Sequence, residues 1–434
     1  MFGFANFLLL ALFAAAVFDL IFALARGGGL RGALHGLWNT PHLLFGQQLA
    51  EWRLQLGRIL FAAGLAAYEI SVVFCNSMAR QNWAWVQGVM SPVLEWLAFL
   101  CFGAKILFGT RYTWRELLAG GALYFIARWV YFNSQNIWWI GIVVAVLAAK
   151  DVPLRRPLQV YFASGCAAMA VVLALHFAGI VAPDLTSERM GALRGTYGYG
   201  HPNTFGGLVF GLVLAYALLR AQKVRWVDCL LVFAVGVFLL VGPASRSAAL
   251  CTLALAVGLV FCRLRAGHSV PRWWPGTCAG MVGLTAAVSY LLPLLVIKVG
   301  PWNNDIGPAW LAKLDSLLTC RISLTWMAYR LLDVKIAGQV FNWPTVDNSF
   351  AFALFQFGPV VAALLGILFA AALLGHAKQG RRVEVCCLFA MLAYAYMEVQ
   401  PFHLTTNPTA SLMFSKTKNS CRCYVCMRSS IGTI

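Results

Sequence analysis

The sequence has little charge and no long polar stretch that could fold as a separate soluble domain. Only 11% of its 434 residues are charged, 61% are hydrophobic, and the mean hydropathy is +0.76. Soluble globular domains carry about 25% charged residues. This composition therefore excludes a soluble globule and indicates a polytopic membrane protein.

Acidic residues are scarce as well, with 15 Asp and Glu against 33 Lys and Arg and a formal net charge of +18. The basic residues are spread over several connections and form no single stripe with interleaved aromatics, so we expect no nucleic-acid partner. Anionic lipid of the inner leaflet accounts for them more simply. No cluster of carboxylates suggests a divalent metal, and we expect neither a metal nor a cofactor.

A disulfide framework is also missing, because most of the 13 cysteines stand singly inside hydrophobic runs, where cysteine behaves as a small apolar residue. The spacing of Cys421, Cys423 and Cys426 superficially resembles a metal site. No second paired motif accompanies it, so we interpret it as incidental.

Apolar runs that can cross a hydrocarbon core of about 30 Å recur along the chain. We predict an all-α fold of about twelve transmembrane helices, near 2–25, 59–75, 92–109, 117–132, 136–149, 158–182, 204–220, 229–243, 247–262, 277–297, 349–375 and 385–400. Residues 1–414 are interpreted as one membrane domain. Residues 415–434 form an atypical polar tail, as a truncated or frame-shifted end would.

Lysine and arginine fall on every second connection between these runs. Six alternate connections carry 19 of them: 26–58, 105–116, 150–157, 220–228, 263–275 and 376–384. The short connections between these carry 5. Because short positively charged loops stay cytoplasmic, we expect the basic connections inside and the others outside.

The longest hydrophilic interval, 299–348, contains a further helical pattern. Apolar residues recur there at spacings of three and four: Leu311, Leu314, Leu318, Ile322, Trp326 and Tyr329. This predicts one amphipathic helix from Trp310 to about Val334, lying across the outer mouth of the bundle.

The polar motifs gather on the predicted outer side. The first is the glycine-rich segment from Arg194 to Gly206, in which His201 and Asn203 flank Pro202 at a helix start. Free N–H groups at a helix N-terminus favour an anion such as phosphate. The alternative is a glycine-rich turn capped by Asn203.

Two arginines belong to further outer motifs. Arg246 stands at a predicted helix start, where it either binds a ligand or reaches the lipid head groups. Arg321 lies among apolar positions of the outer helix, where it either points into the bundle and binds phosphate through both ends of its guanidinium or pairs with Asp315.

Acidic and amide groups complete this set. Asp347 and Asn348 stand at another helix start, where either can cap the helix. Glu398 lies near the outer end of the last full helix and is followed by His403 and Asn407. An ionisable side chain at membrane depth is costly to bury, so its presence suggests a functional role.

The order of these motifs resembles the bacterial polysaccharide polymerases of the O-antigen polymerase and ligase superfamily, in particular the capsular and exopolysaccharide polymerases. The resemblance covers roughly 190–410. It rests on Gly198-x-Gly200-His201-Pro202-Asn203, Ser245-Arg246, Leu314-Asp315-Ser316-Leu317-Leu318-Thr319-Cys320-Arg321-Ile322, Gly338-Gln339, Val346-Asp347-Asn348-Ser349, and Glu398 ahead of Asn407-Pro408.

The resemblance implies polymerisation of polyprenyl-diphosphate-linked oligosaccharide repeat units at the outer face of the bacterial cytoplasmic membrane. Arg246 and Arg321 would bind the diphosphate, with Asn203 and Asn348 as further diphosphate or glycan contacts. His201 would contact phosphate or act as a base. Asp347 and Glu398 are alternative bases or sugar-hydroxyl partners.

The implied partners are the lipid-linked glycan and the bilayer, together with a flippase and a chain-length regulator. Two other functions stay open: transfer of a finished glycan to another acceptor, as in the ligases, and transport of lipid-linked oligosaccharides. A transporter is expected to place charged residues or broken helices near the bilayer midplane.

Two features depart from the family pattern. The family usually has Ser-Gly-Arg where this chain has Thr319-Cys320-Arg321, which predicts loss of a tight glycine turn. The family chain also continues through a further hydrophobic helix after Asn407-Pro408, where this chain enters its polar tail.

The predicted orientation of the connections in the membrane can be tested by cysteine accessibility. In a background without native cysteines, single cysteines at Thr196 and Asn304 should react with an impermeant thiol reagent added to intact cells, and one at Gln379 should not. Labelling of the Gln379 position from outside would reverse the topology.

Overall fold

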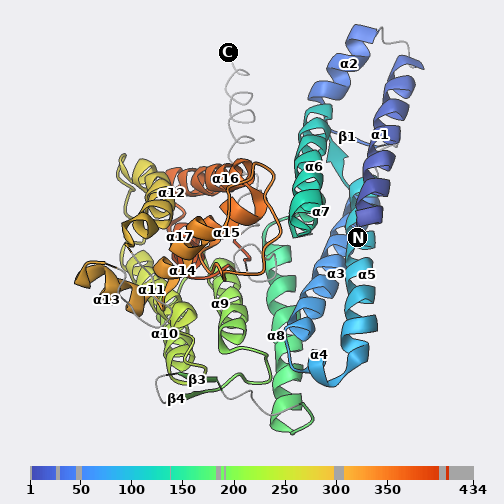
Figure 1. Ribbon diagram of the computed structural model, residues 1–434. Helices are drawn as coiled ribbons and strands as arrows, with labels where there is room; N and C mark the ends of the chain where they lie inside the picture. Colours follow the sequence, from blue (N-terminus) through green and yellow to red (C-terminus); the bar gives the residue numbers. More distant parts are fainter. Residues whose placement is uncertain are drawn as a thin grey trace.

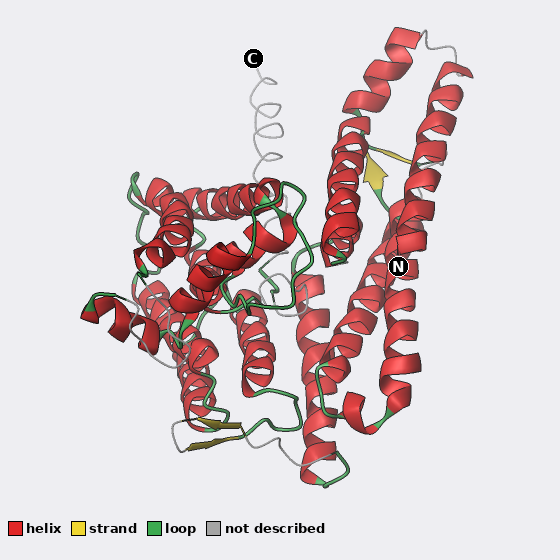
Figure 2. Cartoon of the chain, viewed as in Figure 1, coloured by secondary structure: helices red, strands yellow, loops and turns green. Residues whose placement is uncertain are grey.

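The structure is a computed structural model that describes residues 2–25, 30–44, 51–136, 138–181, 187–189, 192–297, 307–399 and 407–409. These residues are mostly helical, with two short antiparallel ribbons (Figure 2). The ribbons pair β1 (His42–Leu43) with β2 (Arg111–Tyr112) and β3 (Ser187–Arg189) with β4 (Ala192–Arg194). The all-α prediction is confirmed for these residues. His403 and the tail 415–434 lie outside them.

The first half of the chain forms one group of helices around a shared apolar cluster that includes Phe61, Phe102 and Val143. Its elements are α1 (Phe2–Ala25), α2 (Leu30–Asn39), α3 (Glu51–Cys75), α4 (Ala79–Asn82), the π-helical turn η1 (Val86–Met90), α5 (Ser91–Phe108), α6 (Trp114–Ser134) and α7 (Trp138–Ala149).

The second half forms a group around a larger cluster. Its elements are α8 (Arg155–Phe177), α9 (Pro202–Leu219), α10 (Trp226–Val241), α11 (Arg246–Leu264), α12 (Trp274–Leu291), η2 (Leu292–Leu295), α13 (Ala309–Leu317), α14 (Arg321–Leu331), α15 (Ser349–Phe352), η3 (Ala353–Phe357), α16 (Pro359–Lys378) and α17 (Arg382–Met397). Helix α8 contacts α3 on one side and α9 on the other, so it joins the two groups (Figure 1).

Eight helical segments among the described residues are long and apolar enough to cross a membrane. They are Asn6–Ala25, Glu51–Cys75, Val86–Phe108, Arg155–Phe177, Pro202–Leu219, Arg246–Leu264, Trp274–Leu295 and Pro359–Lys378. Two shorter apolar helices, Trp139–Ala149 and Trp226–Val241, accompany them. The chain therefore has the helices of a membrane protein, and the count of twelve spans stays a prediction.

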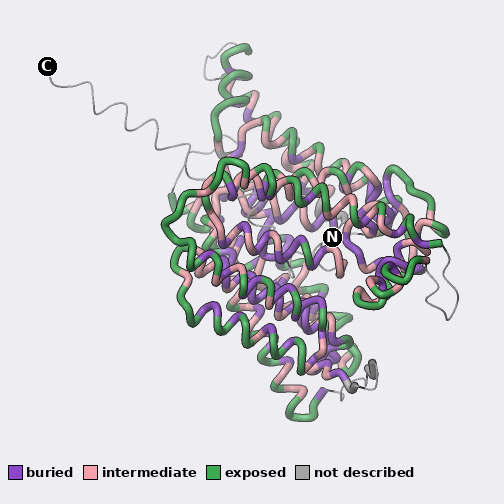
Figure 3. Tube along the Cα trace, turned by 90° about the vertical axis from the view of Figure 1, so that its left-hand side faces the viewer, coloured by how far each residue is buried: buried purple, intermediate pink, exposed green. Residues whose placement is uncertain are grey.

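Burial follows the packing between helices, with buried positions inside and exposed ones along the outer surfaces (Figure 3). Many exposed side chains are apolar: Phe13 on α1 is 69% exposed, and Leu230 on α10 is 67% exposed. Such a surface is unfavourable in water and suits contact with lipid.

The predicted single amphipathic helix over 310–334 is wrong, because the chain forms two helices, α13 and α14, there. Thr319 and Cys320 between them adopt positive φ angles of 58° and 64°. Asp315 accepts hydrogen bonds from the backbone N–H groups of Ile322 and Ser323, at 2.8 and 3.2 Å, and so caps the second helix from the first. The apolar spacing continues across this break, which is why periodicity alone did not reveal it.

The predicted span 349–375 is also interrupted. It divides into α15, the π-helical turn η3 and α16, and the break falls at Gly358, whose φ is 86°. The loop before α15 crosses this break at Gly338, whose φ is 73°. A Cβ atom added to Gly338 would lie 2.0 Å from the backbone oxygen of Gln356, so only glycine permits this approach.

Replacing Gly338 by alanine should therefore destabilise the fold. The added Cβ meets backbone rather than a side chain that can turn away, so we expect a loss of at least about 1–3 kcal/mol, measured as a fall in the melting temperature of the protein in detergent. Gly366→Ala is the control, because a Cβ there meets nothing within 4 Å. Equal melting temperatures for the two variants would contradict the close approach.

Candidate functional site

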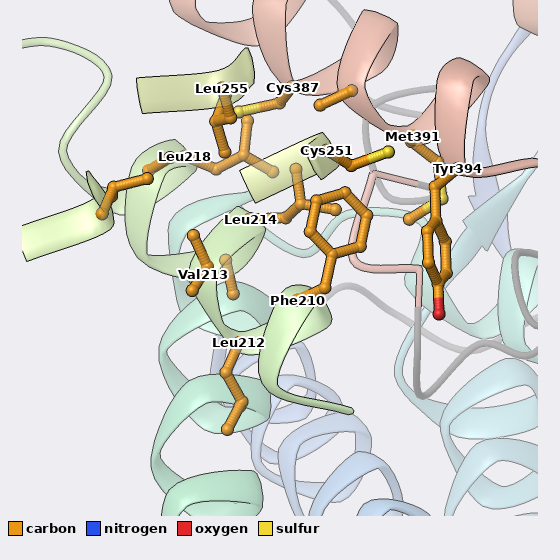
Figure 4. Packing of buried hydrophobic residues seen from close by; sticks show 14 of the residues in the cluster. Phe210, Leu212, Val213, Leu214, Leu218, Cys251, Leu255, Cys387, Met391 and Tyr394 are labelled. Atoms are coloured by element: carbon orange, nitrogen blue, oxygen red, sulfur yellow. The ribbon is translucent and has the colours of Figure 1, made fainter. Parts of the chain in front are cut away.

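The site rests on the apolar packing of α9, α11 and α17. Phe210 of α9 packs against Tyr394 of α17 with ring centroids 4.7 Å apart, and Cys251 of α11 is buried in the same cluster (Figure 4). One or two helical turns away from these residues, Asn203 and Ser247 lie in the first turns of α9 and α11, and Glu398 directly follows α17. Apolar packing between the three helices thus brings these three polar side chains together.

Glu398 is the centre of this cluster. It follows the last residue of α17 and is only 6% exposed. Its Oε1 accepts hydrogen bonds from the Ser247 hydroxyl at 2.7 Å and the Asn203 amide at 3.1 Å, and it forms an ion pair with Arg321 Nη2 at 2.6 Å. Burial raises the pKa of the Glu398 carboxyl above its ordinary value, and the three donors on one oxygen oppose this by favouring the charged form.

Arg321 is the first residue of α14 and is 7% exposed. Besides Glu398, its guanidinium donates to the backbone oxygen of Leu318 at 2.9 Å, and to the Met397 carbonyl and the Thr319 hydroxyl. Arg321 thus points into the bundle, as one of the two alternatives predicted. The other, pairing with Asp315, is wrong, because Asp315 is engaged in capping α14.

The tight turn before Arg321 is retained without glycine, and the predicted loss of the turn is therefore wrong. The two positive φ angles at Thr319 and Cys320 form it. Cys320 N–H donates to the Asp315 carbonyl at 2.8 Å, and the Thr319 hydroxyl accepts from Arg321. These contacts offset the unfavourable left-handed backbone, which costs about 1–2 kcal/mol per residue.

Asn203 connects a second arginine to the cluster. The Asn203 carbonyl oxygen accepts from Arg194 Nη2 at 2.9 Å, while its amide group donates to Glu398. Arg194 is 6% exposed and also donates to the Ala244 carbonyl at 3.2 Å. Two buried guanidinium groups therefore flank one carboxylate.

His201 is the N-cap of α9 and is exposed. Its Nδ1 accepts a hydrogen bond from the backbone N–H of Asn203 at 3.0 Å. A nitrogen that accepts this bond carries no proton, so the neutral ring has its proton on Nε2. In this arrangement His201 presents a donor to the surroundings, which suits a phosphate or sugar oxygen.

Asp347 and Asn348 lie just before α15 and differ in exposure. The Asp347 side chain is 33% exposed, and its Oδ2 lies 4.0 Å from Arg321 Nη2. Asn348 is 4% exposed; it caps α15 through the N–H groups of Phe350 and Ala351 and donates to Ser289 at 3.1 Å. Asp347 is thus the accessible carboxylate of the cluster, and Asn348 holds the helix start.

Arg246 begins α11 with an exposed side chain, next in sequence to the buried Ser247. Successive helical residues point about 100° apart, so Arg246 and Ser247 face different directions. Thr196, the position proposed above for labelling, is fully buried, so exposed Gly200 replaces it in that experiment.

Two cluster residues were not singled out from the sequence. Arg194 begins the recognised glycine-rich segment and Ser247 directly follows the Ser245-Arg246 motif, but a serine and an arginine beside more conspicuous residues carry no local signal of burial. Their contacts depend on the packing of α9 against α11 and α17, which the local sequence does not specify.

The Arg321–Glu398 pair can be tested by a double-mutant cycle. Arg321→Gln and Glu398→Gln should each lower stability by about 3–5 kcal/mol, because each leaves a buried charge without its partner. The double variant should lose clearly less than the sum. Arg330→Gln, an exposed position on the same helix, should change stability by less than about 0.5 kcal/mol. Additive losses would show that the two charges do not interact.

Comparison of the chain with protein-family models, with curated proteins and with solved structures gives no match. The function of the site therefore has to be inferred from its residues and contacts.

Proposed function

We propose that this protein polymerises polyprenyl-diphosphate-linked oligosaccharide repeat units at the outer face of the bacterial cytoplasmic membrane. The observation that carries the proposal is the buried cluster in which Arg321, Glu398, Ser247 and Asn203 meet at the ends of four helices. A membrane protein that handles a lipid diphosphate needs fixed cations at such an end. The motif order that resembles the O-antigen polymerase and ligase superfamily supports the same function.

The chemistry requires little beyond positioning and charge. A sugar hydroxyl of one repeat unit attacks the anomeric carbon of the growing chain, the bond from that carbon to the phosphate oxygen breaks, and the lipid diphosphate leaves with the electron pair. The leaving group is already activated, so no nucleotide is needed. The protein must stabilise the negative charge of the diphosphate and orient the acceptor.

Arg321 is the residue we assign to the diphosphate. Its backbone-facing donors are engaged by Met397 and Leu318, while Nη2, which pairs with Glu398, also faces the partly exposed Asp347 across 4.0 Å. A phosphate oxygen approaching from that side replaces this loose contact. Glu398 holds the guanidinium in place, which makes it a positioning residue.

Asp347 is the proton acceptor we assign, because it is the accessible carboxylate beside Arg321. His201 donates through Nε2 to a phosphate or sugar oxygen, in keeping with its capping tautomer. Arg246 contacts the diphosphate or the lipid head groups from the exposed rim. A flippase that delivers the repeat units and a chain-length regulator are the partners this activity requires.

One observation favours a second candidate, a transporter of lipid-linked oligosaccharides. Glu69 lies inside α3, six residues before its end, and is 1% exposed. A buried carboxyl within a membrane helix is typical of proton-coupled transport. This candidate predicts movement of the lipid-linked glycan across the membrane and no new glycosidic bond.

Purified protein in detergent or liposomes should convert a lipid-linked repeat unit into a ladder of longer glycans without added nucleotide. Arg321→Lys should lower the rate about ten- to hundredfold, because lysine keeps the charge and loses the planar fork. Arg330→Lys, the same change on the exposed face of α14, is the matched control and should retain the rate.

Asp347→Asn separates chemistry from folding, since Asp347 is not part of the buried pair. It should lower the polymerisation rate about a hundredfold or more while the melting temperature stays close to that of the parent protein. A normal ladder from both Arg321→Lys and Asp347→Asn would exclude these roles. Glycan translocation without any ladder would favour the transporter.

A further inference from the structure

Glu69 is the most unusual ionisable group outside the candidate site. Its side chain is 1% exposed, and its Oε2 has no hydrogen-bond partner. Within the described part of the chain, no lysine, arginine or histidine forms an ion pair with it. This contrasts with Glu398, whose Oε1 has three donors as partners.

The space around Glu69 lies where α3, α8 and α9 meet. A Cβ atom added to Gly165 of α8 would lie 3.1 Å from Glu69 Oε1 and 2.7 Å from Leu212 of α9. The missing side chain at Gly165 therefore leaves the room that the carboxyl occupies between apolar walls.

Tyr199 provides a second, independent sign of an unfilled polar contact. It is fully buried, and its hydroxyl has no hydrogen-bond partner. Burial raises the pKa of the Tyr199 hydroxyl, so this group stays a neutral donor, and the Glu69 carboxyl lies near enough to interact with it electrostatically. Two buried polar groups without partners thus lie within electrostatic reach of one another.

The titratable groups that face Glu69 include no cation among the residues the structure describes. They are Tyr68 on α3, Tyr161 and Cys166 on α8, and Tyr199 in the loop before α9; Glu95 on α5 acts on Tyr68. An isolated carboxylate in such surroundings is strongly unfavourable, and in practice the group takes up a proton.

The loop that contains Tyr199, residues 195–201 between β4 and α9, lies between this carboxyl and the candidate site. Tyr199 bridges to Ser77 just beyond the end of α3, and Met78 N–H donates to the Gly198 carbonyl at 2.8 Å. The same loop ends at His201, the N-cap of α9, and Asn203 of the site lies in the first turn of that helix. Packing around Glu69 therefore affects the segment that positions the start of α9.

We propose that Glu69 is a buried proton-binding site, whose carboxyl carries a proton in the folded protein. The observations behind it are the burial of Glu69, its unpartnered Oε2 and the space left by Gly165. It applies equally to a polymerase and to a transporter, and neither of its two tests measures activity.

A protonated Glu69 carboxyl should undergo a specific covalent modification by a carbodiimide. Dicyclohexylcarbodiimide, which is lipid-soluble, accepts the carboxyl proton on nitrogen while the carboxylate oxygen adds to its central carbon; the adduct rearranges to a stable N-acylurea, a gain of one reagent molecule. In liposomes at about pH 6, peptide mass spectrometry should find this adduct on Glu69, and a water-soluble carbodiimide should leave Glu69 unmodified. An unmodified Glu69 with the lipid-soluble reagent, or equal modification by both, would overturn the proposal.

The second test is the pH dependence of stability. A glutamate in the unfolded chain releases its proton above about pH 4.3. If the folded protein keeps the Glu69 proton above that pH, the folded state binds more protons, so its stability falls as pH rises, by up to about tenfold in the unfolding equilibrium per pH unit.

Glu69→Gln is uncharged at every pH and should remove this dependence, so its melting temperature should fall less than that of the parent protein as pH rises from about 5 to about 8. Glu51→Gln is the control, an exposed carboxyl at the start of the same helix α3, and should keep the parent slope. Parallel curves for the parent protein and Glu69→Gln would overturn the proposal.

Discussion

The buried ion pair between Arg321 and Glu398, 2.6 Å apart, is the interaction on which the arrangement of the site depends. It ties the start of α14 to the end of α17, and through Ser247 and Asn203 it also fixes the starts of α11 and α9. Such a pair contributes little net stability, because desolvation of both charges opposes their attraction. We infer that its value is functional, since it holds a guanidinium in one orientation at the end of an apolar bundle.

Local sequence signals predicted where the polar residues stand along the helices, but not which of them meet. The capping preferences and glycines placed His201, Asn348 and Arg246 at helix starts, and all three are found there. The contact of Glu398 with Asn203 joins residues 195 positions apart. That pairing follows from the way α9, α11 and α17 pack, which no local pattern encodes.

The two helix breaks were missed for the same reason. The apolar spacing of three and four continues through Thr319 and Cys320, while the capping by Asp315 that stabilises the turn comes from the preceding helix. At Gly358 the run stays apolar, and the break accommodates the loop at Gly338, twenty residues earlier in the chain. The unpartnered Glu69 carboxyl could not be predicted from the sequence either, because its lack of a hydrogen-bond partner depends on which residues of α8 surround it.

The central claim, that the Arg321 cluster binds a lipid diphosphate, is tested most directly by ligand-induced stabilisation of the purified protein. A ligand at a hundred times its dissociation constant adds about 2.7 kcal/mol. A prenyl diphosphate should raise the melting temperature more than the matching prenyl monophosphate does, and this difference should vanish in Arg321→Lys but persist in Arg330→Lys. Equal stabilisation of all three proteins by the diphosphate would contradict the account.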